Sequence, residues 1–140
     1  MKKPSTLRAD FHMHTHYSSD CATPPERLVA RCVEVGLSCI ALTDHNTIKG
    51  ALEVERMAPF KVIVAEEIKT PFGEITGLVL KEEVPPGLSP QETVARIKEQ
   101  GGLVSIPHPF DRFRNSVLKY EALESILSQV DIIEVFNSRT

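Results

Sequence analysis

Residues 38–45 read Ser-Cys-Ile-Ala-Leu-Thr-Asp-His, and this stretch indicates the fold class of the chain. The apolar run Cys-Ile-Ala-Leu predicts a buried strand, which ends where two polar residues, Asp44 and His45, begin. In α/β barrels the chemistry lies at the carboxyl ends of the strands, because that rim gathers residues from distant parts of the chain. The stretch therefore indicates a sheet strand that delivers polar side chains to a site.

Helical patterns flank this strand on both sides. Thr23 and Glu26 have the spacing of a capping box, and apolar residues then repeat at helical spacing from Leu28 until Gly36, which can end the helix. Further helices are expected over residues 48–57, after a second capping-box pattern at 89–92, and over residues 118–129. Each of these helices lies between two predicted strands.

The other strands are expected over residues 7–11, 61–65, 74–80, 103–106 and 131–136, and Pro71-Phe72-Gly73 predicts a turn that pairs two of them as a hairpin. Strands therefore alternate with helices, with one hairpin inserted. Such alternation predicts an α/β fold with a largely parallel sheet or barrel. No repeat, linker or low-complexity segment divides the sequence, so residues 1–140 are expected to form a single domain.

The composition is that of an ordinary globular domain, with 140 residues, 41% hydrophobic and 25% charged. The formal net charge of −3 predicts no nucleic-acid partner, although it leaves room for a small phosphorylated substrate at a metal cluster. The 3 cysteines form no Cys-x-x-Cys pair, which favours a reducing cytoplasm. No signal peptide or bilayer-spanning apolar run is recognised, so no membrane association is expected.

All 5 histidines fall in three clusters at the ends of predicted strands: His12, His14 and His16; His45; and His108. A single histidine would be interpreted as a surface residue or a satisfied core residue. Histidines grouped at one rim instead predict a metal site. In the His-x-His pair of an extended chain, both imidazoles point to the same side and can bind one ion.

Acidic residues accompany these histidines. Asp20 offers a hard oxygen ligand, although it could also be a turn residue. Asp44 could orient an imidazole or approach the substrate, and it could equally cap the helix that follows. Glu66 and Glu67 are adjacent at a strand end, so only one should point into the site, and the spacing does not choose between them.

A rigid histidine and several cations follow the strand at 103–106. Pro107 and Pro109 restrict the backbone on both sides of His108 and would present its imidazole rigidly. Arg112 could contact phosphate oxygens. Arg114 and Lys119 could do the same, but a solvated loop is the favoured interpretation for these two residues.

Four motifs occur in order along the chain: Asp-x-His-x-His-x(5)-Asp at 10–20, Thr-Asp-His at 43–45, Glu-Glu-Ile at 66–68 and His-Pro at 108–109. Together they resemble the PHP (polymerase and histidinol phosphatase) domain, and its stand-alone phosphoesterase branch in particular. The resemblance implies a distorted (β/α)7 barrel with up to three metal ions. It assigns His12 and His14 to a first ion, His108 to a second, Asp20 and His45 to a third, Glu67 as a bridge between two ions, and Glu74 as a further ligand after the hairpin.

The resemblance also implies a function. We expect a metal-dependent phosphoesterase that uses Zn, Mn or Fe and a metal-activated water on a small phosphorylated substrate, with Glu67, Asp44 and Arg112 as catalytic residues. The family's late Gly-x-Asp-x-His segment does not occur in the sequence, which predicts an incomplete, TIM-like barrel without its last strands. The alternatives are an inactive module that binds metal or a phosphorylated ligand, and a hydrolase of C–N or C–O bonds. A second copy could cover the open barrel edge.

Overall fold

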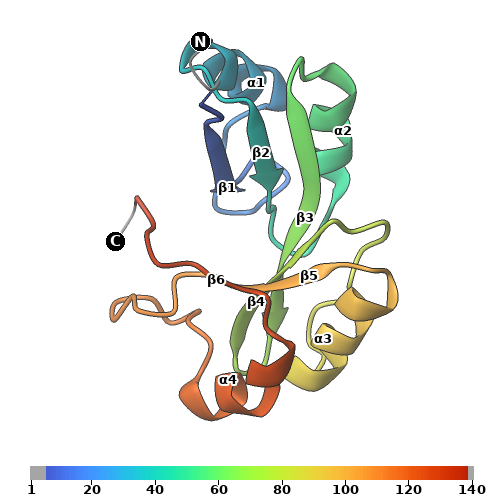
Figure 1. Ribbon diagram of the computed structural model, residues 1–140, viewed down its shortest axis with the longest axis vertical. Helices are drawn as coiled ribbons and strands as arrows, with labels where there is room; N and C mark the ends of the chain where they lie inside the picture. The colour runs from blue at the N-terminus through green and yellow to red at the C-terminus, as the bar shows by residue number, and fades with distance from the viewer. Residues whose placement is uncertain (1–5, 139–140) are drawn as a thin grey trace, which may run out of the picture.

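Strand β3 (Lys61–Thr70) is the longest strand and runs through both halves of a bent sheet (Figure 1). The structure, a computed structural model, describes residues 6–138. The other elements are β1 (Ala9–Met13), α1 (Pro25–Glu34), β2 (Cys39–Leu42), α2 (Lys49–Met57), β4 (Gly73–Leu78), α3 (Pro90–Glu99), β5 (Leu103–Ile106), α4 (Tyr120–Ile126), the 3-10 helix η1 (Leu127–Gln129) and β6 (Ile132–Ile133). The six strands lie in the order β1-β2-β3-β4-β5-β6.

The sheet bends because β3 changes partner halfway along its length. Its first half pairs with β2 in parallel, up to the register Leu42–Val64, and its second half pairs with β4 in antiparallel, from Ala65–Leu78 onward. Strand β1 continues the parallel half, whereas β5 is antiparallel to β4 and β6 is parallel to β5. Figure 1 shows the first half with α1 and α2, and the second half with α3 and α4.

Each half of the sheet has its own apolar core. Ile40, Leu42 and Val54 are buried between the parallel strands and the first two helices. A larger cluster joins strands β3, β4 and β5 to α3 and α4, and its fully buried members are Ile68, Ile75, Val84, Val94, Ile97, Val104, Ile106 and Ile126. Burying side chains of this size contributes roughly 1.5–3 kcal/mol each, so both cores hold the strand ends firmly in place.

The expected α/β fold with an incomplete barrel is confirmed. The sheet curls, but β1 and β6 do not pair with each other within residues 6–138, so both edges stay open. The expected hairpin is present as β3 and β4. Cover of the open edge by a second copy stays a prediction. No helix in the described part of the chain is long and apolar enough to cross a membrane.

Several sequence-based boundaries were wrong. Strand β1 covers Ala9–Met13 rather than residues 7–11, so His12 lies within it. Strand β3 continues past residue 65 to Thr70, because antiparallel pairing with β4 holds the backbone extended through the two glutamates. The last strand, expected over 131–136, is limited to Ile132–Ile133. Thr23 does not cap α1, whose N-cap is Pro24 in an extended conformation without a side-chain bond. The second capping box, Ser89 with Glu92, is confirmed.

Glu66 is a fully buried carboxylic acid on the face of β3 opposite to its neighbour. Its Oε2 accepts the backbone N–H of Val84 at 2.9 Å, and Oε1 has no hydrogen-bond partner among the described residues. Burial raises the pKa of Glu66 to about 7, and the bond from Val84 opposes this rise only partly. The folded chain therefore keeps this proton to a higher pH than the unfolded chain does.

We predict that Glu66→Gln flattens the pH dependence of stability. Because the pKa rises from 4.5 to about 7 on folding, the parent loses stability as the pH rises through this window. The loss should reach roughly 3 kcal/mol at pH 8 relative to pH 4, and Glu66→Gln should not show it. Urea unfolding with chelator present measures this, with the exposed Glu55→Gln on α2 as control. Equal slopes for the parent and Glu66→Gln would contradict the assignment.

Candidate metal centre

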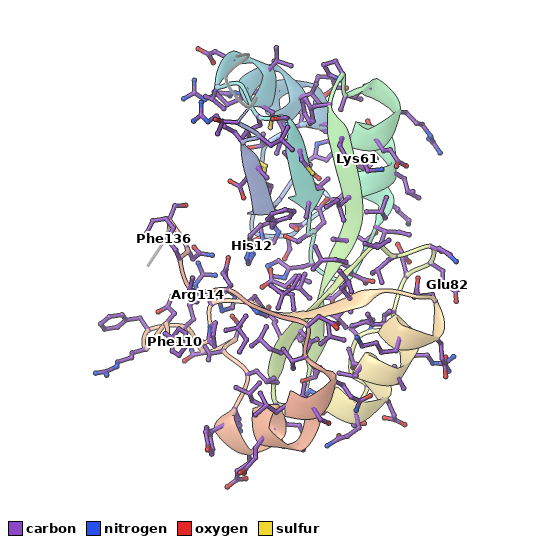
Figure 2. All side chains as sticks on the ribbon, viewed as in Figure 1. His12, Lys61, Glu82, Phe110, Arg114 and Phe136 are labelled. Atoms are coloured by element: carbon purple, nitrogen blue, oxygen red, sulfur yellow. The ribbon has the colours of Figure 1, made fainter. Side chains whose placement is uncertain are left out.

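The candidate site lies where the two halves of the sheet meet. The end of β1, the loops after β2 and β5, and strands β3 and β4 all bring polar side chains to this place. Figure 2 shows His12 at the end of β1, facing the second half of the sheet, with Arg114 nearby on the loop side. The partner change of β3 therefore positions the site, because it turns the second half of the sheet under the ends of β1 and β2.

Glu67 is the centre of this cluster and is only 1% exposed. Its Oε2 lies 3.3 Å from Nε2 of both His12 and His14, and 3.5 Å from Nδ1 of His45. Its Oε1 lies 2.9 Å from Nε2 of His108. Side chains alternate along a strand, so Glu66 points away while Glu67 meets four imidazoles. The structure thus brings Glu67 into the site, a choice that spacing alone left open.

The cluster contains two groups that could each hold a metal ion. One consists of His12, Glu67 and His108, and the other of His14, His45 and Glu67, with the donor atoms of each group within 4.8 Å of one another. This grouping differs from the one that the resemblance implied, because it separates His12 from His14 and His45 from Asp20. Glu67 belongs to both groups. Imidazole nitrogens with a carboxylate oxygen are donors that suit Zn, Mn or Fe, and three protein donors leave positions open for water or substrate. The residues present therefore fit a two-ion centre with a shared carboxylate.

Asp20 and Glu74 lie at the margin of the cluster, next to His45. Asp20 Oδ2 is 3.6 Å from His45 Nε2, and its side chain is 44% exposed. Glu74 Oε1 is 3.5 Å from His45 Nδ1, and its Oε2 is 3.6 Å from His108 Nε2. Neither residue belongs to the two three-donor groups. The structure brings both predicted ligands beside the histidines, and their role in a third ion site stays a prediction.

His45 is placed by the backbone rather than by a regular strand. It forms an isolated bridge to Glu67, in which Glu67 N–H donates to the Asp44 carbonyl and Asn46 N–H donates to the Glu67 carbonyl. Asn46 has a φ of 57°, which turns the chain sharply after this bridge. The bridge therefore holds the backbone of His45 beside the backbone of Glu67, the central carboxylate.

Asp44 lies behind the cluster and is 1% exposed. Its carboxylate accepts bonds from the Thr15 N–H and hydroxyl, both at 2.6 Å, and from the Ser18 hydroxyl at 3.0 Å. Ser18 Oγ in turn lies 3.1 Å from His14 Nδ1. Asp44 does not cap α2, whose N-cap is Ile48. It also does not line either of the two pockets beside the cluster. Of the roles that the sequence left open, the geometry agrees with orientation of an imidazole, here through Ser18.

The loop at 110–116 borders the cluster. It lines a pocket of about 760 Å³ together with Asp20, His45 and Glu74. Arg112 lines this pocket but is exposed to solvent. Arg114 also lines the neighbouring pocket that contains His12 and His14, and Asp111 Oδ2 accepts its Nε–H at 2.9 Å. The sequence analysis favoured Arg112, whereas the structure gives Arg114 the more defined position.

Glu134 is a residue of the site that the sequence analysis missed. Its Oε1 lies 3.0 Å from His12 Nδ1, and its Oε2 accepts the backbone N–H of His108. It follows the short strand β6, at a place where the sequence indicated only a strand that ends near Asn137. The one feature of the sequence that could have indicated a site residue here is an acidic side chain directly after an apolar strand.

The charges of the cluster are strongly coupled. Burial lowers the pKa of His12, but hydrogen bonds with Glu134 and Glu67 outweigh burial and raise it to about 10. Burial raises the pKa of Glu67, but hydrogen bonds from the histidines, His108 first, lower it well below its ordinary value. Burial and then the charge of Glu67 raise the pKa of Glu74. Protons and metal ions therefore compete for the same nitrogens, and acid should weaken metal binding.

Comparisons with known proteins agree with this geometry. The family model of the PHP domain matches residues 10–125. An uncharacterized protein of Methanocaldococcus jannaschii is 37% identical over 147 aligned residues, which cover 94% of this chain and 82% of that protein. The resemblance noted from the sequence motifs is therefore confirmed.

Two solved structures share the fold. A two-domain protein from Bacteroides vulgatus, which contains a predicted PHP-like metal-dependent phosphoesterase, has a TM-score of 0.77 and 20% identity, and the match covers 92% of this chain and 44% of that one. A predicted metal-dependent phosphoesterase from Bifidobacterium adolescentis has a TM-score of 0.74 and 17% identity, with 96% and 79% of the two chains covered. The family model, which matches most of the chain, shows that the chain belongs to the PHP domain family.

Proposed function

We propose that this domain hydrolyses phosphate esters with the help of divalent metal ions. The observation that carries the proposal is the sharing of Glu67 between two three-donor groups, because a bridged pair of ions is a recurrent arrangement in phosphatases. The names of the two structural neighbours, both predicted metal-dependent phosphoesterases, support the same class of reaction. The substrate would be a small phosphorylated molecule that fits the pocket beside the cluster.

The chain's own residues supply binding and orientation. His12 and His108 would hold one ion, His14 and His45 the other, and Glu67 both. Such ions, when bound, supply Lewis acidity and a water of lowered pKa. The low exposure of Glu67 limits the access of bulk water, so charges in the cluster interact strongly.

Arg112 and Arg114 would bind the phosphate oxygens at the pocket edge. A guanidinium can donate two parallel N–H bonds to a phosphate, which orients the ester as well as binding it. Arg114 is preoriented by its bond to Asp111, so less side-chain entropy is lost on binding than for the exposed Arg112. Arg114 should therefore contribute more to substrate binding than Arg112.

We predict that Glu67→Gln abolishes metal binding in both groups together with phosphatase activity. A neutral amide cannot provide two anionic oxygens to two ions, so turnover of a phosphomonoester should fall by at least roughly 100-fold. Glu66→Gln is the matched control, because this neighbour faces away from the cluster. Turnover retained in Glu67→Gln would refute the bridging role.

The same assay separates the competing functions. The metal-loaded protein should hydrolyse members of a phosphomonoester panel and leave a matched panel of amides and carboxylic esters intact. Turnover of amides alone would indicate a C–N hydrolase instead. Bound metal without turnover of either panel would indicate the inactive binding module.

We predict that Arg114→Ala weakens phosphate binding more than Arg112→Ala does. A hydrogen bond to a charged group contributes roughly 1.5–3 kcal/mol, so the KM for a phosphomonoester and the inhibition constant of inorganic phosphate should both rise by about 10-fold or more. Arg96→Ala on α3 is the control, because Arg96 is exposed and pairs with Glu99 in its own helix. Unchanged constants in Arg114→Ala would exclude the proposed contact.

A further inference from the structure

We propose that Glu134 is a positioning residue that orients both histidines of the His12–Glu67–His108 group and so sets the metal affinity of that group alone. The inference rests on the proposed metal centre. It concerns a residue that neither the sequence motifs nor the family resemblance pointed to. Its basis is that one carboxylate contacts both histidines of one group and neither histidine of the other.

The first contact fixes the ring of His12. Glu134 Oε1 lies 3.0 Å from His12 Nδ1, and an ionised carboxylate can only accept at this distance, so Nδ1 carries the hydrogen. The lone pair of the neutral ring is then on Nε2, the atom that lies 3.3 Å from Glu67. A carboxylate on the far nitrogen is the usual way in which proteins set the tautomer and direction of a metal-binding histidine.

The second contact fixes the backbone that carries His108. This residue has a φ of 33°, which is unfavourable for a side chain with a Cβ and needs support from its surroundings. Pro107 and Pro109 have no N–H, so the N–H of His108 is the one backbone donor of this tripeptide, and Glu134 accepts it. The Nδ1 of His108 has no hydrogen-bond partner among residues 6–138, so the ring contact of Nε2 with Glu67 and the backbone bond to Glu134 together hold the imidazole in place.

Glu134 can reach both histidines because of its place in the sheet. Its own N–H donates to the carbonyl of Ile106 at the end of β5, which continues the β5–β6 pairing by one residue. From there the side chain crosses to β1, and it thus connects the two edge strands that do not pair directly. The Asn137 amide lies 3.3 and 3.4 Å from the two carboxylate oxygens and restrains them.

The other group has a separate support. His14 Nδ1 lies 3.1 Å from Ser18 Oγ, which is held by the buried Asp44, and the Ser18 oxygen also accepts the N–H of His45. Glu134 takes no part in these bonds. Each metal group therefore has its own positioning carboxylate, Glu134 for the first and Asp44, through Ser18, for the second. A change at Glu134 should weaken one ion and leave the other in place.

The test is a metal titration of Glu134→Gln. The amide offers one acceptor oxygen, so at most one of the two contacts survives. Competition with a chromophoric chelator, using Zn²⁺ and the metal-free chain, should show two sites in the parent. In Glu134→Gln the affinity of one site should fall roughly 10–100-fold, as for other residues that orient metal ligands, while the second site stays unchanged. Glu124→Gln, on the exposed face of α4, is the matched control.

A second variant and a second readout keep the result decisive. Glu134→Asp keeps the charge but draws the carboxylate back by one methylene, so it should give the same selective loss in a folded chain. NMR of the metal-free chain should show that at least one of two protons, the His108 amide proton and the His12 ring N–H, loses its downfield shift in Glu134→Gln, and that both lose it in Glu134→Asp. If the parent chain binds no metal, the proposed metal centre is refuted, and the proton shifts still test whether Glu134 accepts hydrogen bonds from the two histidines. Two unchanged sites, an equal loss at both sites, or unchanged proton shifts would overturn the proposal.

Discussion

The contact of one buried carboxylate, Glu67, with four imidazoles is the interaction on which the site depends. A charge at this depth is costly unless it is paired, and here four imidazole nitrogens that can carry a proton or bind a metal ion lie within 3.5 Å of its two oxygens. The surrounding fold serves to bring these nitrogens together. They come from the ends of β1 and β5 and from the loop after β2, which are far apart in the sequence.

The bend of the sheet is what brings these histidines to one carboxylate. A flat parallel sheet would align the strand ends in one row, and side chains of β1 and β5 would be separated by the strands between them. Because β3 pairs in parallel with β2 and then in antiparallel with β4, the second half of the sheet turns under the first. His12 and His108 thereby meet on the same carboxylate, with ring centroids 5.7 Å apart. Glu134, which follows edge strand β6, adds a second contact between the two halves of the sheet by hydrogen bonding to His12 on edge strand β1.

Much of this arrangement could be predicted from the sequence, because local patterns carry it. The strand at 103–106, the capping box at Ser89 and the turn at 71–73 depend on neighbours in the chain, and the structure has all three. The choice of Glu67 over Glu66 could not come from spacing, since it depends on which face of β3 meets the loop after β2. The positions of Arg114 and Glu134 depend on tertiary contacts that are weak or absent in the local pattern, so the sequence did not reveal them.

Metal content per chain is the measurement that tests the central claim most directly. The protein is purified without chelator, equilibrated with excess Zn²⁺ or Mn²⁺, desalted and analysed for metal and protein in the same sample. Two three-donor groups that share Glu67 predict at least two ions per chain, and Glu66→Gln should retain them. One ion or none in a folded parent chain would contradict a bridged centre and would leave the histidine cluster as a network of hydrogen bonds.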